Sequence, residues 1–450
     1  MQYEGEYAQK LTATEDAAKL VKSGMWIDLG FFMGIAYLME EEIAERADEL
    51  EDVKIRTTGF HLEPQTVKAD PEQKHFIFND FFIMKRERRY YDMGCLSHIP
   101  FNFHDEPRVY REFLKDEVDI AFMEVTPMDR GGYFNFGVGL AAQKAICDVA
   151  KTVVVEVNRL MPWVPGGYDE SIHISDVDFI VENEKYEIPE LGNPDATDVD
   201  KKIAENVAPL IENGSTIQLG IGGMPNIIGQ LLIEHGKKDL GIHTEMFTDS
   251  MADLIEEGVV TGKKKSLNPG KAVHCFAAGS RRMYDFMDHN ISLAGFPVDY
   301  TNDPYIISQN EKQVAINSAI VVDLTGQVCS ETAGYRHISG TGGQLDFTLG
   351  AYMSKGGKAF TCLHSTYKTK DGKMESRIVP CLKYGDAVTV PRSITSYVAT
   401  EYGVVNLKGR SCGERAKLLI SIAHPDFRDE LEREAEEKNI IPKALRRRKR

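Results

Sequence analysis

The chain has 450 residues, of which 42% are hydrophobic and 27% are charged, a balance typical of folded globular proteins rather than disordered ones. At about 150 residues per domain, this length predicts two or three domains. The net charge of −16 argues against general affinity for nucleic acid or for an anionic membrane surface, so we expect neither as a partner.

The chain ends and the cysteines indicate a cytoplasmic protein. Residues 1–6 are polar and acidic, unlike a secretory signal, and no stretch reaches the roughly 18 apolar residues of a membrane span. The seven cysteines are scattered and form no Cys-x-x-Cys pair, so we interpret them as buried thiols in a reducing compartment. The basic run 446–450 is interpreted as a solvated tail, with a functional contact as the alternative.

Two pairs of segments predict an internal duplication. Residues 19–30 and 209–220 share a helix end, a glycine, an apolar strand and a second glycine at one offset. Asp129 and Asp323, each three residues before a glycine, repeat at nearly the same offset. Two matches in the same order indicate two copies of one unit.

A polar stretch containing two prolines separates the two copies. It places the first domain at 1–185, a linker at 186–199 and the second domain at 200–435. The residues that remain, 436–450, form a basic tail.

Short apolar runs at 152–157, 216–221 and 359–363 are typical of buried strands, and the pattern of 226–236 is typical of a helix that ends at a glycine. Alternating strands and helices predict an α/β fold with two similar open, largely parallel domains. Such sheets bind ligands at the carboxyl ends of their strands, so we expect the active site in the cleft between the domains.

Two glycine loops could bring backbone N–H groups to a ligand oxygen. Residues 220–226 join a predicted strand to a predicted helix, where a tight turn is an equally good explanation. Pro225 occupies the third glycine position of a dinucleotide fingerprint, which disfavours a nucleotide-dependent oxidoreductase. Residues 339–347 contain three glycines in four positions, which could form an anion-binding concavity or a flexible turn.

The residues alone leave the catalytic group open. Glu245 is predicted at a strand end just before a helix, where it could be a nucleophile, a solvated charge or a hydrogen-bond acceptor. The twelve histidines show no metal-binding spacing, so no metal site is predicted. A Gly-x-Ser-x-Gly esterase motif is absent, and Cys329 is interpreted as a core residue.

The sequence resembles the acetyl-CoA hydrolase/transferase family, the glutamate-dependent CoA-transferases. The likeness covers nearly the whole chain and includes the ordered motifs at 124–137, 243–246, 298–303, 339–347 and 400–403. It implies two open α/β domains with the active site between them. It also implies a short-chain acyl-CoA:carboxylate CoA-transferase that converts butyryl-CoA and acetate to butyrate and acetyl-CoA.

The resemblance also implies roles for individual residues. It makes Glu245 the nucleophile, which passes through a mixed anhydride and a glutamyl-CoA thioester in a ping-pong reaction. The residues implied for the oxyanion hole and CoA binding are Ile221, Gly222, Gly223, Asn302, Gly340, Gly342 and Gly343. No cofactor is expected to bind tightly, because coenzyme A is a substrate and transient adduct. The expected partners are acyl-CoA, short-chain carboxylates and further copies of the chain in a homo-oligomer.

Two alternatives use the same site: a 4-hydroxybutyrate CoA-transferase, and an acyl-CoA hydrolase in which water intercepts the adduct on Glu245. One departure from the family bears on the substrate. Trp163 stands where relatives commonly have arginine. If its loop lines the acyl pocket, the apolar indole disfavours dicarboxylates such as succinate, and a packing change at the rim is the alternative.

Overall fold

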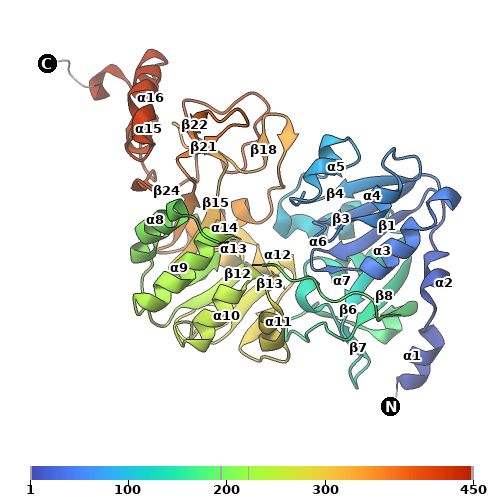
Figure 1. The fold of residues 1–450 in the computed structure, drawn as a ribbon. Coiled ribbons are helices and arrows are strands. Elements are labelled where there is room, and N and C mark those ends of the chain that lie inside the picture. Colours follow the sequence, from blue (N-terminus) through green and yellow to red (C-terminus); the bar gives the residue numbers. More distant parts are fainter. Residues whose placement is uncertain (1–2, 193–194, 221, 447–450) are drawn as a thin grey trace.

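The computed structural model describes residues 3–192, 195–220 and 222–446, and these residues form two α/β domains (Figure 1). In the sheet of the N-terminal domain, all neighbouring strands are parallel except for the short β2, which pairs antiparallel with β1. The strands in spatial order are β10 (Phe179–Asn183), β8 (Thr152–Asn158), β6 (Ile120–Val125), β1 (Trp26–Phe31), β3 (Val53–Thr58), β4 (Phe76–Asp80) and β5 (Ser97–His98), with β2 (Gly34–Ile35) beside β1.

The sheet of the C-terminal domain is also parallel, apart from the antiparallel pair β24–β25 at one edge. Its strands in spatial order are β14 (Leu293–Gly295), β13 (Ala272–Ala277), β12 (Gly241–Phe247), β11 (Thr216–Leu219), β15 (Gln313–Ser318), β20 (Lys358–Cys362), β24 (Tyr397–Thr400) and β25 (Gly403–Asn406). The predicted α/β class with two largely parallel sheets is confirmed.

The two sheets are built in the same sequence of steps. With β2 left aside, the first strand of each sheet lies in its interior, the next three strands along the chain add on one side, and the later strands add on the other. The turns at Asp129 and Asp323 also match, because each carboxylate accepts hydrogen bonds from the N–H groups two and four residues further on. A common ancestor would produce this likeness, although the duplication itself stays a prediction.

The helices connect successive strands and cover the sheets (Figure 1). Those of the N-terminal domain are α1 (Glu4–Lys10), α2 (Thr14–Ala18), α3 (Tyr37–Ala44), α4 (Gln65–Ala69), α5 (Arg88–Asp92), α6 (Glu106–Arg108) and α7 (Gln143–Val149). Those that follow are α8 (Asp198–Val207), α9 (Gly223–Glu234), α10 (Asp249–Glu256), α11 (Arg281–Met287), α12 (Val298–Thr301), α13 (Pro304–Ser308), α14 (Gln344–Met353), α15 (Cys412–Ser421) and α16 (Pro425–Glu437).

Several predicted elements lie where the sequence placed them. The runs at 152–157, 216–221 and 359–363 correspond to β8, β11 and β20. The expected glycine stops follow α9 and α10, where Gly236 and Gly258 adopt φ angles of +60° and +69° that favour glycine. Along the chain, β10 is the last strand of the first sheet and α8 is the helix that follows it. The predicted linker, 186–199, lies largely between these two elements.

Within the described residues, shorter strands form three two-stranded sheets and one three-stranded sheet, and several of these lie above the C-terminal sheet in Figure 1. They are β7 (Tyr133–Asn135) with β9 (Ser171–His173), β18 (Thr332–Ala333) with β19 (Arg336–His337), β21 (Thr366–Lys368) with β22 (Met374–Ser376), and β17 (Val328–Cys329) with β16 (Val321–Asp323) and β23 (Ile378–Val379). The β18–β19 hairpin reaches across to α5 of the N-terminal domain (Figure 1). There Arg336 forms a two-pronged ion pair with Asp92, with N···O distances of 2.7 and 2.6 Å.

One continuous core cluster crosses between the domains. Phe31 and Phe103 of the N-terminal domain pack with Phe276 of β13, with ring centroids 4.8 and 6.3 Å from that of Phe276. This shared core fixes the carboxyl end of the first sheet against that of the second. A pocket at those ends is lined by residues of both domains.

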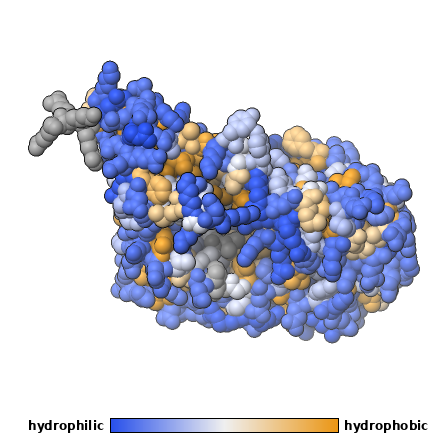
Figure 2. Space-filling view, turned by 45° about the horizontal axis from the view of Figure 1, so that its top comes forward, coloured by the Kyte–Doolittle hydropathy of each residue, from blue (hydrophilic) through white to orange (hydrophobic). Residues whose placement is uncertain are grey.

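The surface agrees with the composition. Blue, hydrophilic residues dominate the face in Figure 2, and the orange residues lie in separate small groups. In the described part of the chain, no helix is long and apolar enough to cross a membrane. The expectation that all cysteines are buried is wrong for Cys381 and Cys412, which are exposed because they lie in a surface loop and at the start of α15.

Candidate active site

Glu245 lies near the carboxyl end of β12, two residues before the strand ends. Its neighbours in the strand are buried, and α10 begins at Asp249 with Thr248 as its N-cap residue. The side chain of Glu245 therefore projects from a rigid element into the space between the two sheets. This agrees with its predicted place at a strand end just before a helix.

Asn302 and Gly343 hold the carboxylate of Glu245. The Nδ2 of Asn302 donates a hydrogen bond to Oε2 of Glu245 at 2.6 Å, and the backbone N–H of Gly343 donates a second hydrogen bond. A Cβ atom on Gly343 would lie 1.8 Å from Oε2 of Glu245 and 2.3 Å from Nδ2 of Asn302. Only glycine therefore fits at this position, at the N-terminus of α14.

The surroundings of Glu245 set its charge. Burial raises the pKa of Glu245 to about 7, and the nearby carboxylate of Asp346 acts in the same direction. The hydrogen bonds from Asn302 and Gly343 oppose this rise because they stabilise the charged form. A substantial fraction of Glu245 is therefore ionised at neutral pH.

His243, two residues before Glu245, serves to position the loop opposite. Burial lowers its pKa to about 3, so it is neutral. Its Nε2 donates to the carbonyl oxygen of Thr301 at 2.8 Å, and its Nδ1 accepts from Asn310 at 3.2 Å. Since Thr301 precedes Asn302, this contact fixes the residue that holds the nucleophile.

Hydrogen bonds between the two domains support Asn302, the residue that holds Glu245. Asp346 on α14 accepts hydrogen bonds from the backbone N–H and from Nδ1 of His104, at 3.1 and 2.7 Å, and a further one from Asn302. The carboxylate of Asp346 raises the pKa of His104 through this hydrogen bond. A chain of hydrogen bonds thus runs from the N-terminal domain through Asp346 and Asn302 to Glu245.

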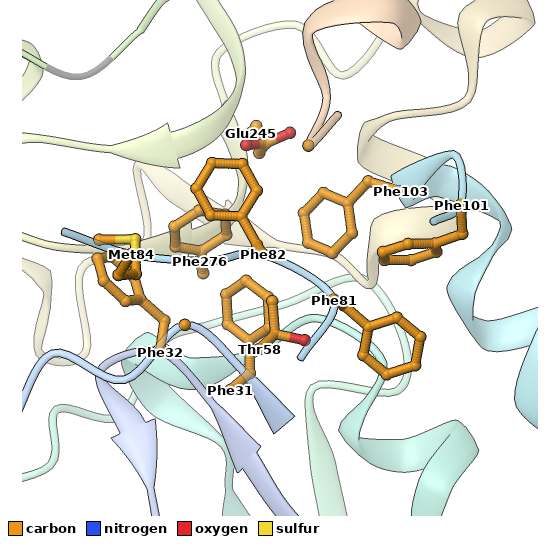
Figure 3. Close-up of a pocket in the computed structure, with 12 residues that line it drawn as sticks. Phe31, Phe32, Thr58, Phe81, Phe82, Met84, Phe101, Phe103, Glu245 and Phe276 are labelled. Carbon is orange, nitrogen blue, oxygen red and sulfur yellow. The ribbon is translucent and has the colours of Figure 1, made fainter. Parts of the chain in front are cut away.

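Beside Glu245 lies an apolar pocket (Figure 3). The residues that line it are Phe31, Phe32, Thr58, Gly59, Phe81, Phe82, Met84, Phe101, Phe103, Glu245, Phe276 and Gly342. Figure 3 shows the phenyl rings gathered on one side of the carboxylate, with Phe82, Phe103 and Phe276 nearest to it. The hydroxyl of Thr58 and the carboxylate of Glu245 are the polar side-chain groups among these residues.

The second glycine loop is brought to Glu245, whereas the first has no contact with it in the described residues. Gly342, with a φ of +51°, lines the pocket beside Gly343. Gly340 packs against the N-terminal domain, where a Cβ would lie 2.6 Å from the carbonyl oxygen of Phe81. Gly222 and Gly223 begin α9 after β11, the strand beside β12, and Ile221 lies outside the described residues.

Trp163 lies apart from the pocket. Its ring stacks on that of His289 with centroids 6.0 Å apart, and its backbone N–H donates to Asp288 at 2.8 Å. The residues that follow it pair with the edge strand β14, where the N–H of Gly295 donates to the carbonyl oxygen of Pro165. This loop docks one domain on the other, and a role for Trp163 in acyl selection stays a prediction without a contact to the pocket.

Sequence reasoning missed the aromatic wall and the His104–Asp346 pair. The rings come from segments that follow β1, β4 and β5, and they meet only because those strands end at one edge of the sheet. A signal was present, because phenylalanines cluster at 31–32, 81–82 and 101–103, each at or just after an apolar strand. No local pattern pairs His104 with Asp346, which lie in different domains.

The comparisons with known proteins agree with this geometry. The model of the acetyl-CoA hydrolase/transferase N-terminal domain matches residues 1–191, and that of the C-terminal domain matches residues 279–435. The chain is 43% identical to butyryl-CoA:acetate CoA-transferase of Anaerostipes caccae over 98% of this chain and 99% of that protein. It is 40% identical to 4-hydroxybutyrate coenzyme A transferase of Clostridium kluyveri, over 96% and 98% of the two chains.

The chain is also similar to a solved structure over nearly its whole length. The chain superposes on the crystal structure of RipA from Yersinia pestis with a TM-score of 0.88 and 36% identity, covering 98% of this chain and all of that one. Fold, site and similarity together define an enzyme of the CoA-transferase class. The chain belongs to the acetyl-CoA hydrolase/transferase family.

Proposed function

We propose that this protein is a short-chain acyl-CoA:carboxylate CoA-transferase that converts butyryl-CoA and acetate to butyrate and acetyl-CoA, with Glu245 as the nucleophile. The observation that carries this proposal is the position of Glu245. Its carboxylate lies between backbone and amide N–H donors on one side and an apolar pocket on the other. A thioester carbonyl next to Glu245 could place its acyl chain in that pocket.

The first half of the reaction moves CoA onto the enzyme. The ionised carboxylate of Glu245 attacks the carbonyl carbon of butyryl-CoA, and the C–S bond breaks. CoA departs as the thiolate, and a mixed anhydride of Glu245 and butyrate is formed. The thiolate then attacks the glutamyl carbonyl carbon, butyrate leaves, and a glutamyl-CoA thioester remains. Each tetrahedral intermediate carries an oxyanion, for which N–H donors of the second glycine loop are suited.

The second half runs the same steps in reverse. Acetate attacks the glutamyl-CoA thioester and expels the thiolate, which then attacks the acetyl carbonyl of the new anhydride. Acetyl-CoA leaves and the carboxylate of Glu245 is restored. Because one thioester is exchanged for another of similar energy, the reaction needs no nucleotide hydrolysis.

The pocket favours a butyryl group over a 4-hydroxybutyryl group. Burying a hydroxyl without a hydrogen-bond partner costs about 1–3 kcal/mol in proteins. The pocket offers only the hydroxyl of Thr58, whose own residue is 7% exposed at the end of β3. A charged second carboxylate, as in succinate, would be more costly still because no cationic side chain lines the pocket among the described residues.

A product assay tests this proposal. The enzyme is incubated with butyryl-CoA in the presence and absence of acetate, and free CoA, acetyl-CoA and residual butyryl-CoA are quantified by chromatography. The proposal expects acetyl-CoA only with acetate, little free CoA, and a higher kcat/KM for butyryl-CoA than for 4-hydroxybutyryl-CoA. Free CoA released at the same rate without acetate would instead indicate a hydrolase. A preference for 4-hydroxybutyryl-CoA would reverse the substrate assignment.

Cytoplasmic location and homo-oligomeric assembly stay predictions.

A further inference from the structure

A second group of polar side chains lies where the β18–β19 hairpin meets the N-terminal domain. His98 is the last residue of β5, His337 is the last residue of β19, and Glu331 directly precedes the hairpin. One ring nitrogen of each histidine and one carboxylate oxygen of Glu331 all lie within 4.8 Å of one another. These three residues do not line the pocket at Glu245.

Both histidines present an unused nitrogen in a buried position. The Nε2 atoms of His98 and His337 are shielded from solvent and have no hydrogen-bond partner. Buried polar atoms without a partner are uncommon because they lose their hydration and gain nothing in exchange. The two rings lie against each other, with centroids 4.1 Å apart.

The environment of His98 fixes which nitrogen is free. Its Nδ1 lies 3.2 Å from the carbonyl oxygen of Asp80, which can only accept a hydrogen bond. Nδ1 therefore carries the proton and Nε2 carries the lone pair. A histidine that binds a metal commonly donates its other ring N–H to a backbone carbonyl in this way.

The carboxylate of Glu331 is shielded at the same place as the two histidines, because its residue is only 7% exposed. A metal ion takes histidine in its deprotonated form, in which one ring nitrogen offers a lone pair.

We propose that His98, Glu331 and His337 bind a zinc ion at the contact between the two domains. Two imidazole nitrogens and one carboxylate oxygen form a donor set that Zn²⁺ accepts, with a water molecule as the fourth ligand. Bond lengths of about 2.0–2.2 Å require the three side chains to draw closer together through small rotations. The sequence predicted no metal site because the ligands come from distant segments and show no motif spacing.

This zinc ion is placed to hold the second glycine loop. The backbone carbonyl of Glu331 accepts hydrogen bonds from the N–H groups of Ile338 and Ser339 at 2.7 and 3.1 Å. A Cβ on Gly340 would lie 3.1 Å from Cε1 of His98, so the loop passes directly over the histidine. Through Glu331 and His98, the metal would thus hold the loop that brings Gly343 to Glu245. Its role is positional, and no reaction step passes through it.

Metal binding by the full chain tests the proposal. The protein is stripped with a chelator, dialysed and titrated with ZnCl₂ by calorimetry, and bound zinc is counted by mass spectrometry. The experiment uses a Cys381→Ser/Cys412→Ser background, because these two exposed thiols could take zinc elsewhere. We expect one zinc per chain, a melting temperature raised by about 2 °C or more on binding, and at least about tenfold weaker affinity in Glu331→Gln and His98→Ala.

A matched control and a second readout make the test decisive. His289→Ala removes an exposed histidine that stacks on Trp163 and is expected to leave zinc affinity unchanged. Co²⁺ in place of zinc should give the visible bands of a tetrahedral nitrogen and oxygen site, a result obtained on the unsubstituted ligands even if a variant fails to fold. Absence of zinc binding at micromolar ZnCl₂, or equal affinity in Glu331→Gln, would overturn the proposal.

Discussion

The two walls of the pocket at Glu245 differ in kind. The N-terminal domain contributes most of the phenylalanine rings and Met84, whereas the C-terminal domain contributes Phe276 together with the carboxylate, the amide of Asn302 and the N–H of Gly343. Both walls sit at the carboxyl ends of sheets with the same strand order. Under the proposed function, two sheets of similar topology would thus serve two tasks: the second domain would hold the reacting groups, and the first would surround the acyl chain.

This division makes the C-terminal wall the more sensitive to substitution. The largest effect is expected from Glu245→Gln, which keeps the shape of the side chain and removes the nucleophile. We expect CoA transfer to fall by about 10³-fold or more, because Glu245 carries the only carboxylate among the described residues that line the pocket. Steady-state rates with butyryl-CoA and acetate measure this, and a variant with the unmodified rate would contradict the division.

Gly343→Ala tests the hydrogen-bond donors of the same wall. The added Cβ would overlap Oε2 of Glu245 and Nδ2 of Asn302, so the loop must move away from the carboxylate. Loss of an oxyanion-type donor typically costs about 10²–10³ in kcat. Gly5→Ala, in the exposed helix α1 with no atom within 4 Å of the added Cβ, is the control and should change kcat by less than about twofold.

The N-terminal wall should alter selection rather than chemistry. Phe82→Ala removes a ring beside the carboxylate, and we expect kcat/KM for butyryl-CoA to fall by about 10–200-fold while the rate with acetyl-CoA changes less. Phe113→Ala removes an exposed ring elsewhere and serves as the control. Equal losses of kcat/KM for butyryl-CoA and acetyl-CoA would show that the side chains of this wall do not select the acyl chain.

The pH dependence reports on the balance of groups around Glu245. Since the attacking form is ionised and its pKa is about 7, kcat/KM should fall about tenfold per pH unit below 7 and level off above it. Asn302→Ala removes a hydrogen bond that stabilises the carboxylate and should move this limb to higher pH. Asp346→Asn removes a like charge and should move it to lower pH. Shifts in the same direction in both variants would contradict the assigned causes.

The smallest effect is expected at Trp163. Its contacts with His289 and Asp288 lie outside the pocket, so Trp163→Arg should leave the ratio of kcat/KM for butyryl-CoA and succinyl-CoA within about twofold. A strong gain for succinyl-CoA would show that this docking loop acts on acyl selection, as the sequence first suggested.

The features that the sequence predicted well are those with a local cause. Strand β12, helix α10 with Gly258 after it, and Glu245 between them follow from residue patterns a few positions long. The identity of Glu245 as the functional glutamate came from resemblance to a family, because an isolated glutamate at a strand end has many explanations. The roles of neighbouring residues could not be assigned in this way.

What the sequence did not predict depends on packing between domains. Phe82 of the N-terminal domain becomes a neighbour of Glu245 only after the two sheets face each other, and hydrophobic periodicity does not specify that pairing. Likewise, His104 meets Asp346, and Trp163 turns to His289, through contacts that no spacing rule describes. Local sequence patterns determine the helices and strands, whereas the site forms where residues from distant parts of the sequence meet.

Trapping of the covalent adduct tests the central claim most directly. The enzyme is mixed with butyryl-CoA, treated with sodium borohydride, digested and analysed by mass spectrometry. A glutamyl-CoA thioester predicts that the side chain of Glu245 is reduced to a primary alcohol, with activity lost in proportion and no reaction when acyl-CoA is omitted. Full activity after this treatment, or reduction at any other carboxylate, would contradict the account.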